Sequence, residues 1–166
     1  MAIEHDYFGL LSSGPDGSIF WSETVDLGDQ AVTVDLTAPD QDDVSAEALD
    51  IAAALISGLE DVDATARRGM LAEVDDRTSE VTEYILQQQE AHGDDLDAVL
   101  VDVSGDAAVD IIRSLRLMSM TILADEHGGS EPFAVLEYAL DVDEDDDVLL
   151  VNLASDGSVQ SVMSAD

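Results

Sequence analysis

The period of the hydrophobic residues changes twice along the chain, and this change constrains the fold more than any other feature. Near both ends apolar residues alternate with polar ones, the two-residue period of a strand with one buried face. In the middle of the chain they recur at three- and four-residue steps, the period of an amphipathic helix. Strands, then helices, then strands predict an α+β fold with helices packed on one face of a sheet.

Strands are predicted in the first third of the chain. They cover Tyr7–Leu11, Ile19–Leu27 and Val32–Leu36. The segments between them, SGPDG at residues 13–17 and Gly28-Asp29, contain residue types that favour turns. Such short connections predict an antiparallel meander.

Helices are predicted in the central third. They cover Ser45–Leu59, Ala64–Val74, Ser79–Ala91 and Ala107–Leu117. Ser45 is a residue type that favours the N-cap position, and Gly93 is typical of a helix C-terminus. Residues 94–105 are ambiguous, because the run Ala98–Val103 fits either a buried strand or the start of a helix.

Strands are predicted again in the last third. They cover Met120–Ala124, Phe133–Leu140, Val148–Leu153 and Val159–Met163, with an Asp-Gly turn before the last of them. We therefore expect a single domain over residues 1–166. It combines an antiparallel sheet, built from an N-terminal and a C-terminal meander, with three to four helices on one face.

Charge limits the partners that such a chain can have. Thirty-nine Asp and Glu residues oppose five basic residues, all of them Arg, for a formal net charge of -34. Nucleic-acid binding depends on Lys and Arg neutralising phosphates, and anionic membranes attract basic segments. The composition therefore predicts neither a nucleic-acid partner nor a membrane partner.

The acidic residues are evenly divided along the chain. Twenty lie in residues 1–83 and nineteen in residues 84–166. An even division favours carboxylates spread over the whole surface, as in salt-adapted proteins, where charge keeps molecules apart. The alternative is a DNA mimic that inhibits a basic protein, which would gather its carboxylates on one face.

The most acidic segment is the run Asp141–Asp147, in which six of seven residues are acidic. An EF-hand loop that begins at Asp141 requires Gly at its sixth position and Glu at its twelfth. The chain has Asp146 and Asn152 there. The run is therefore interpreted as a solvated hairpin loop between two strands, and weak cation binding is left open.

Catalytic motifs are absent from the sequence. There is no cysteine, no H-E-x-x-H pair, no P-loop and no G-x-S-x-G. The histidines His5, His92 and His127 are far apart in sequence, although His5 and His127 each adjoin an acidic residue. We therefore predict no catalytic residue, no cofactor and no metal. A hydrolase or metal-dependent enzyme that uses His5 or His127 with nearby carboxylates is the alternative.

Arginines are scarce and therefore informative. Arg67, Arg68 and Arg77 flank the predicted second helix, and Arg113 and Arg116 lie three residues apart on a later one. In so acidic a chain each is expected to pair with a carboxylate, as Arg113 could with Asp110. A positive patch for an anionic ligand is the alternative.

Parts of the sequence resemble a bacterial family known as domain of unknown function 2004. The similarity lies in IEHDYFG at Ile3–Gly9, Trp21, QAVTVDL at Gln30–Leu36 and the closing segment Leu140–Val162. The resemblance implies a single bacterial α+β domain and transfers no activity and no catalytic residue.

Together these observations predict a non-enzymatic cytoplasmic protein that binds another protein. The partner is unidentified and is expected to be basic if the chain is an immunity-like inhibitor; a homodimer is also left open. The candidate interaction residues are His5, Asp6, Tyr7, Trp21, Arg67, Arg68, Arg113, Arg116 and His127.

Overall fold

The computed structural model describes residues 2–28, 30–40, 42, 44–100, 103–124, 132–140 and 148–165. Its strands are β1 (Ala2–His5), β2 (Gly9–Ser12), β3 (Ile19–Leu27), β4 (Gln30–Ala38), β5 (Arg116–Leu123), β6 (Ala134–Ala139), β7 (Val148–Leu153) and β8 (Val159–Ala165). Its helices are α1 (Ala46–Ser57), α2 (Leu59–Glu73), α3 (Glu80–His92), the 3-10 turn η2 (Gly93–Asp95), α4 (Leu96–Val99) and α5 (Ala107–Ser114). The predicted α+β class is confirmed.

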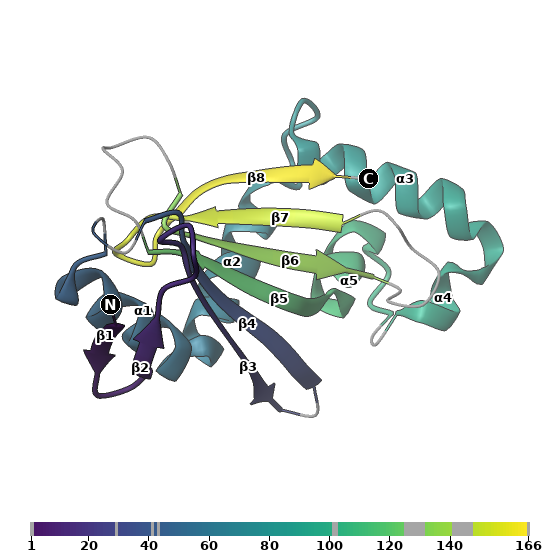
Figure 1. Ribbon diagram of the computed structural model, residues 1–166. Coiled ribbons are helices and arrows are strands. Elements are labelled where there is room, and N and C mark those ends of the chain that lie inside the picture. Colours follow the sequence, from purple (N-terminus) through teal and green to yellow (C-terminus); the bar gives the residue numbers. More distant parts are fainter. Residues whose placement is uncertain are drawn as a thin grey trace.

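Six strands form the main sheet, in the order β3-β4-β5-β6-β7-β8. Neighbouring strands are antiparallel except β4 and β5, which are parallel with Val34 opposite Met120. The prediction of a wholly antiparallel sheet is wrong at this junction. Parallel neighbours need a crossover connection, and the helical segment between β4 and β5 supplies it on one face of the sheet (Figure 1).

The N-terminal hairpin is separate from the main sheet. β1 and β2 pair only with each other, and an isolated bridge between Ser13 and Ile19 links the hairpin to β3. The strand predicted at Tyr7–Leu11 therefore exists as β2, which begins two residues later and ends one residue later. It does not join the meander. Its hydrogen bonds are made instead with β1, a strand that the sequence analysis did not predict.

Helix boundaries follow local capping. The hydroxyls of Ser45 and Ser79 accept hydrogen bonds from the first turns of α1 and α3, which satisfies backbone N–H groups that have no partner within the helix. The ambiguous segment is helical at its start, in η2 and α4. The predicted helix Ala107–Leu117 ends at Ser114, because Leu115 takes an extended ψ of 140° and β5 begins at the next residue.

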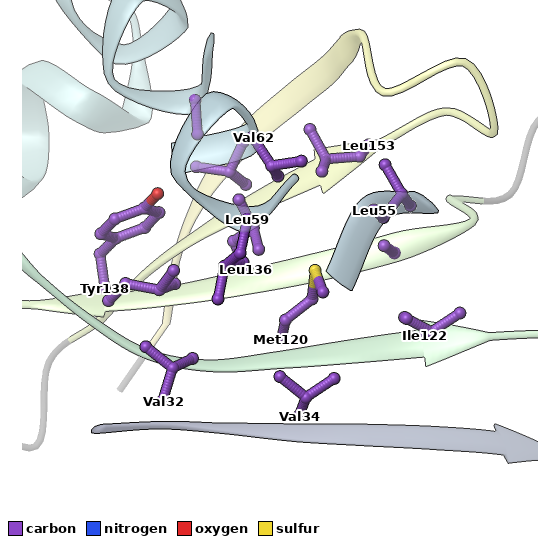
Figure 2. Close-up of a cluster of buried hydrophobic side chains, with 14 of the residues drawn as sticks. Val32, Val34, Leu55, Leu59, Val62, Met120, Ile122, Leu136, Tyr138 and Leu153 are labelled. Carbon is purple, nitrogen blue, oxygen red and sulfur yellow. The ribbon is translucent and has the colours of Figure 1, made fainter. Parts of the chain in front are cut away.

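The hydrophobic core lies between the helices and the sheet. Figure 2 shows Leu55 of α1 and Leu59 and Val62 of α2 above Met120 and Leu136. The strand residues that point toward the helices are almost completely buried, whereas their neighbours in sequence, apart from Ala139 of β6, are not. This alternation is what the two-residue period of the sequence predicts. Among the described residues, no helix is long and apolar enough to span a membrane.

Candidate interaction surface

The six-stranded sheet has two unlike faces. One face is covered by the helices, and in the described part of the chain no helix covers the other (Figure 1). We call this second surface the open face. Two of its cross-strand rows are Ser22, Asp35, Thr121, Val135, Asn152 and Ser161, and Thr24, Thr33, Ser119, Glu137, Leu150 and Met163.

Carboxylates are unevenly distributed over the open face and are scarce toward β8. Strands β5, β7 and β8 contain no Asp or Glu at all. The open face carries Asp26 on β3, Asp35 on β4 and Glu137 on β6. By contrast, α1, α2 and α3 together carry nine acidic residues. The expectation that carboxylates cover the whole surface is therefore wrong for this face.

Apolar side chains take the place of the missing charges toward β8. Val135, Val148 and Leu150 are half-buried there, and Met163 is 44% exposed. At the other end of the sheet, Phe20 of β3 is 68% exposed. The face of a sheet that meets only water normally carries polar residues. Apolar residues at these positions therefore favour contact with another surface.

The N-terminal hairpin gathers four aromatic rings on the opposite side of the molecule. Phe8 is buried and makes edge-to-face contacts with Tyr7 and Trp21, with centroids 5.0 Å and 4.8 Å away. The ring of His5 lies 5.3 Å from that of Phe8. Trp21 stands opposite the core residue Leu36, so this cluster attaches the hairpin to the helix-covered side of β3. Burial and the nearby Glu23 raise the pKa of the Tyr7 hydroxyl.

Both ring nitrogens of His5 are engaged. Nε2 lies 2.8 Å from Oδ1 of Asp50 on α1, and Nδ1 accepts the backbone N–H of Tyr7 at 3.1 Å. The second contact fixes Nδ1 as an acceptor, so Nε2 carries the proton that is donated to Asp50. In this arrangement both nitrogens of His5 make contacts that hold the hairpin on α1.

Arg67 is the centre of a second polar cluster, within the helix layer. Its Nε donates to both carboxylate oxygens of Asp63 at 3.1 Å. Its Nη1 and Nη2 donate to the carbonyls of Ile112 and Leu115, at 2.9 Å and 2.6 Å, at the end of α5. Carbonyls at a helix C-terminus lack partners within the helix, so Arg67 satisfies them. The pairing predicted for this arginine is confirmed, and its donors are used within the fold.

Tyr138 completes the Arg67 cluster from the sheet. Its hydroxyl donates to Asp63 at 2.7 Å, and the guanidinium of Arg67 lies over its ring, 5.3 Å from the centroid. Burial raises the pKa of the Tyr138 hydroxyl strongly, and the charge of Asp63 raises it further. The phenol therefore stays protonated and acts as a hydrogen-bond donor that ties β6 to α2.

The other arginines do not gather around Arg67. Arg68 is exposed and contacts its own helix, through the carbonyl of Ala64 and the hydroxyl of Thr65. Arg113 is exposed at the end of α5, where its charge contributes to the lowered pKa of Asp110. Arg116 lies on the open face, opposite Ala139, and is the only Lys or Arg in the six strands of the sheet. Arg67 and Arg68 lie within α2 rather than beside it.

Two of the buried polar residues, Asp110 and Gln88, were not among the predicted site residues. Asp110 of α5 accepts the hydroxyl and the backbone N–H of Ser104, at 2.6 Å and 2.8 Å, and these bonds lower its pKa, the hydroxyl most. Gln88 of α3 is fully buried, and its side-chain amide has no hydrogen-bond partner among the described residues. Neither group adjoins a motif that would have marked it in the sequence.

The remaining candidates divide into two groups. Asp6 is exposed in the turn between β1 and β2. His127 and the acidic run Asp141–Asp147 lie outside the described residues, although the antiparallel strands β6 and β7 do flank that run as predicted. The structure thus brings His5, Tyr7 and Trp21 together, and it places Arg67 and Arg116 at separate sites.

Metal ligands do not converge in the described ranges, where no group of three or more His, Asp or Glu side chains could hold an ion. No family model, no curated protein and no solved structure matches the chain. The resemblance to domain of unknown function 2004 therefore stays a prediction.

Proposed function

We propose that this protein is a non-enzymatic binding module that docks a partner protein on the open face. The observation that carries the proposal is the charge distribution. In a chain with 39 acidic residues, three adjacent antiparallel strands, β6, β7 and β8, contain a single carboxylate, that of Glu137. A surface that only needed to stay soluble would gain from charge at these positions.

The side chains on this face suit protein contact. Interface cores are depleted of charge and contain apolar residues, including Met, and Val135, Leu150 and Met163 fit that description. The acidic residues of α1, α2 and α3 lie on the other side of the sheet (Figure 1). Charge outside the contact acts on the rate of association and on the choice of partner more than on affinity.

An immunity-like inhibitor would bind a basic partner, and the helices suit such a partner better than the open face. The acidic residues of α1, α2 and α3 are the ones that would attract it. Which surface binds can therefore be tested by placing one new charge on each side.

Binding can be tested by capture with three forms of the purified protein. These are the unmodified chain, Leu150→Glu on the open face, and Leu86→Glu on α3. Leu86 is 59% exposed, so the control introduces the same charge on a leucine outside the sheet. A captured protein counts only if it reforms a complex after separate purification.

We expect Leu150→Glu to weaken that complex at least about tenfold, since the new carboxylate must be desolvated at the centre of the interface. Leu86→Glu should leave it unchanged. A complex that both variants weaken equally, or that only Leu86→Glu weakens, would place binding on the helices and contradict the proposal.

A further inference from the structure

We infer that the partner on the open face is a second copy of this chain, so that two sheets stack in a face-to-face homodimer. This inference rests on the proposed function, because it uses the same surface. It adds the identity of the partner and the geometry of the contact.

The sign of the charge favours a copy over a basic partner. Each chain carries a formal charge of -34, so two copies repel one another wherever carboxylates meet. A surface shaped for a basic partner would place carboxylates against it. From β5 to β8 the open face does the opposite, because these four strands contain one carboxylate, that of Glu137, and the other two on the face, Asp26 and Asp35, lie at its β3–β4 end. Removal of charge from one face is what a partner of like charge requires.

The shape of the face also suits a copy of itself. Two antiparallel sheets pack about 10 Å apart with their strands within about 30° of each other, and apolar side chains fill the space between them. Val135, Leu150 and Met163 would supply that layer from each copy. A two-fold axis through the face brings the same patch onto itself, the usual arrangement in homodimers.

The area suffices for a reversible dimer when all six strands take part, including the β3–β4 end that carries Asp26 and Asp35. Six strands about 4.8 Å apart and about six residues long cover roughly 25 Å by 20 Å, or about 500 Å² per copy. The total of about 1,000 Å² is near the lower limit for a specific interface. We therefore expect a weak dimer rather than an obligate one.

Polar groups on the face limit the affinity but do not prevent contact. Glu137 is half-buried and already accepts the hydroxyl of Ser119 at 3.3 Å. Arg116 is on the same face of each copy, so the two-fold arrangement supplies a cation as well as a carboxylate from each side. A charged pair across the interface would offset part of the desolvation cost of Glu137.

Salt gives the test its sharpest readout. Screening reduces repulsion between like charges, and the Debye length falls from about 10 Å at 0.1 M salt to about 3 Å at 1 M. A homodimer should therefore tighten as sodium chloride rises over this range. A complex with a basic partner should loosen over the same range.

The experiment is sedimentation equilibrium of the purified chain at several sodium chloride concentrations. We expect a monomer–dimer equilibrium that tightens with salt and that Leu150→Glu weakens at least about tenfold. Met163→Glu should also weaken the dimer. Because Met163 is more exposed than Leu150, this variant is less subject to a folding defect and therefore serves as a second test. Leu86→Glu should dimerise like the unmodified chain.

Three outcomes would overturn the inference: a monomer at every salt concentration, a dimer that loosens with salt, or a dimer insensitive to Leu150→Glu. The proposed function fails separately. If the chain is monomeric but captures a different protein through the open face, the binding module stands and the homodimer does not.

Discussion

Adjacent residues of β6 meet two different environments. Leu136 and Tyr138 point into the core beneath α2, whereas Val135 and Glu137 point to the open face. The covered face is tied to the helices by a dense core and by the Arg67 cluster. On the open face the described residues form no covering helix, and the carboxylates are limited to Asp26, Asp35 and Glu137. The comparison shows that acidic residues are common on the helices and scarce on the open face of β5 to β8.

The largest expected effect separates the two faces on a single strand. Leu136→Ala should lower the free energy of unfolding by about 2–5 kcal/mol, because it leaves a cavity among packed neighbours. Val135→Ala, one residue away on the open face, should cost about 1 kcal/mol or less, because its side chain is half-buried and the site can relax. Urea denaturation measures the free energy of unfolding of both variants. An m-value equal to that of the unmodified chain shows that the difference is one of stability.

If Val135→Ala proves as costly as Leu136→Ala, the open face is packed against something in solution. Repeating the measurement over a range of protein concentration would then show whether a second copy is responsible, since the stability of a dimer depends on concentration.

A smaller effect is expected within the helix layer. Arg67→Met should cost about 3 kcal/mol, because it leaves the half-buried Asp63 without its cation and removes the donors at the end of α5. Arg68→Met, at the next position on α2, should change stability by less than about 0.5 kcal/mol, since Arg68 contacts only its own helix.

Thermal or urea unfolding of the two arginine variants, side by side, measures this difference. Equal losses for both would mean that the Arg67 contacts contribute no net stability, and that packing alone holds α2 and α5 against the sheet.

The smallest effect concerns Asp110, the one buried carboxylate among the described residues. Its pKa in the folded chain lies below the ordinary value of 3.8, mainly because the Ser104 hydroxyl donates to the charged form. This contribution to stability is therefore present above that ordinary value and is lost as the pH falls through the lower folded pKa.

Asp110→Asn should accordingly be less stable than the unmodified chain near neutral pH, and the difference should narrow below a pH of about 4. Urea midpoints across this pH range provide the measurement. Ser104→Ala should reproduce the narrowing, and the double variant should lose little more than either single one. A gap that stays constant with pH would contradict the assignment.

Much of this fold can be predicted from hydrophobic period. The strands at Ile19–Leu27 and Val148–Leu153 agree with their predicted bounds, the first from its alternation and the second from its nearly continuous apolar run. The parallel pairing of β4 with β5 could not be predicted, since alternation reports which side is buried and not which strand lies beside it. The helix predicted to Leu117 was too long, because Leu115 takes an extended ψ of 140° and β5 begins at Arg116.

The interaction surface was missed because charge was counted by position along the chain. Halves of the sequence contain nearly equal numbers of acidic residues, yet the difference lies between helices and strands, which are interleaved in sequence. Counting acidic residues within each predicted element would have revealed it. The Arg67 and Asp110 contacts depend on residues far apart in the chain or outside any motif, and no local signal marks them.

The single parallel junction has a consequence for how the chain reaches its native state. β3 with β4, and β5 through β8, are each built from pairings between sequence neighbours, which close short loops. Joining the two groups requires Leu36 to meet Ile122 across the whole helical insertion. Contacts between distant residues are the slow ones in folding. We therefore expect two preformed sheet fragments to assemble late, with the rate set by the docking of β4 on β5.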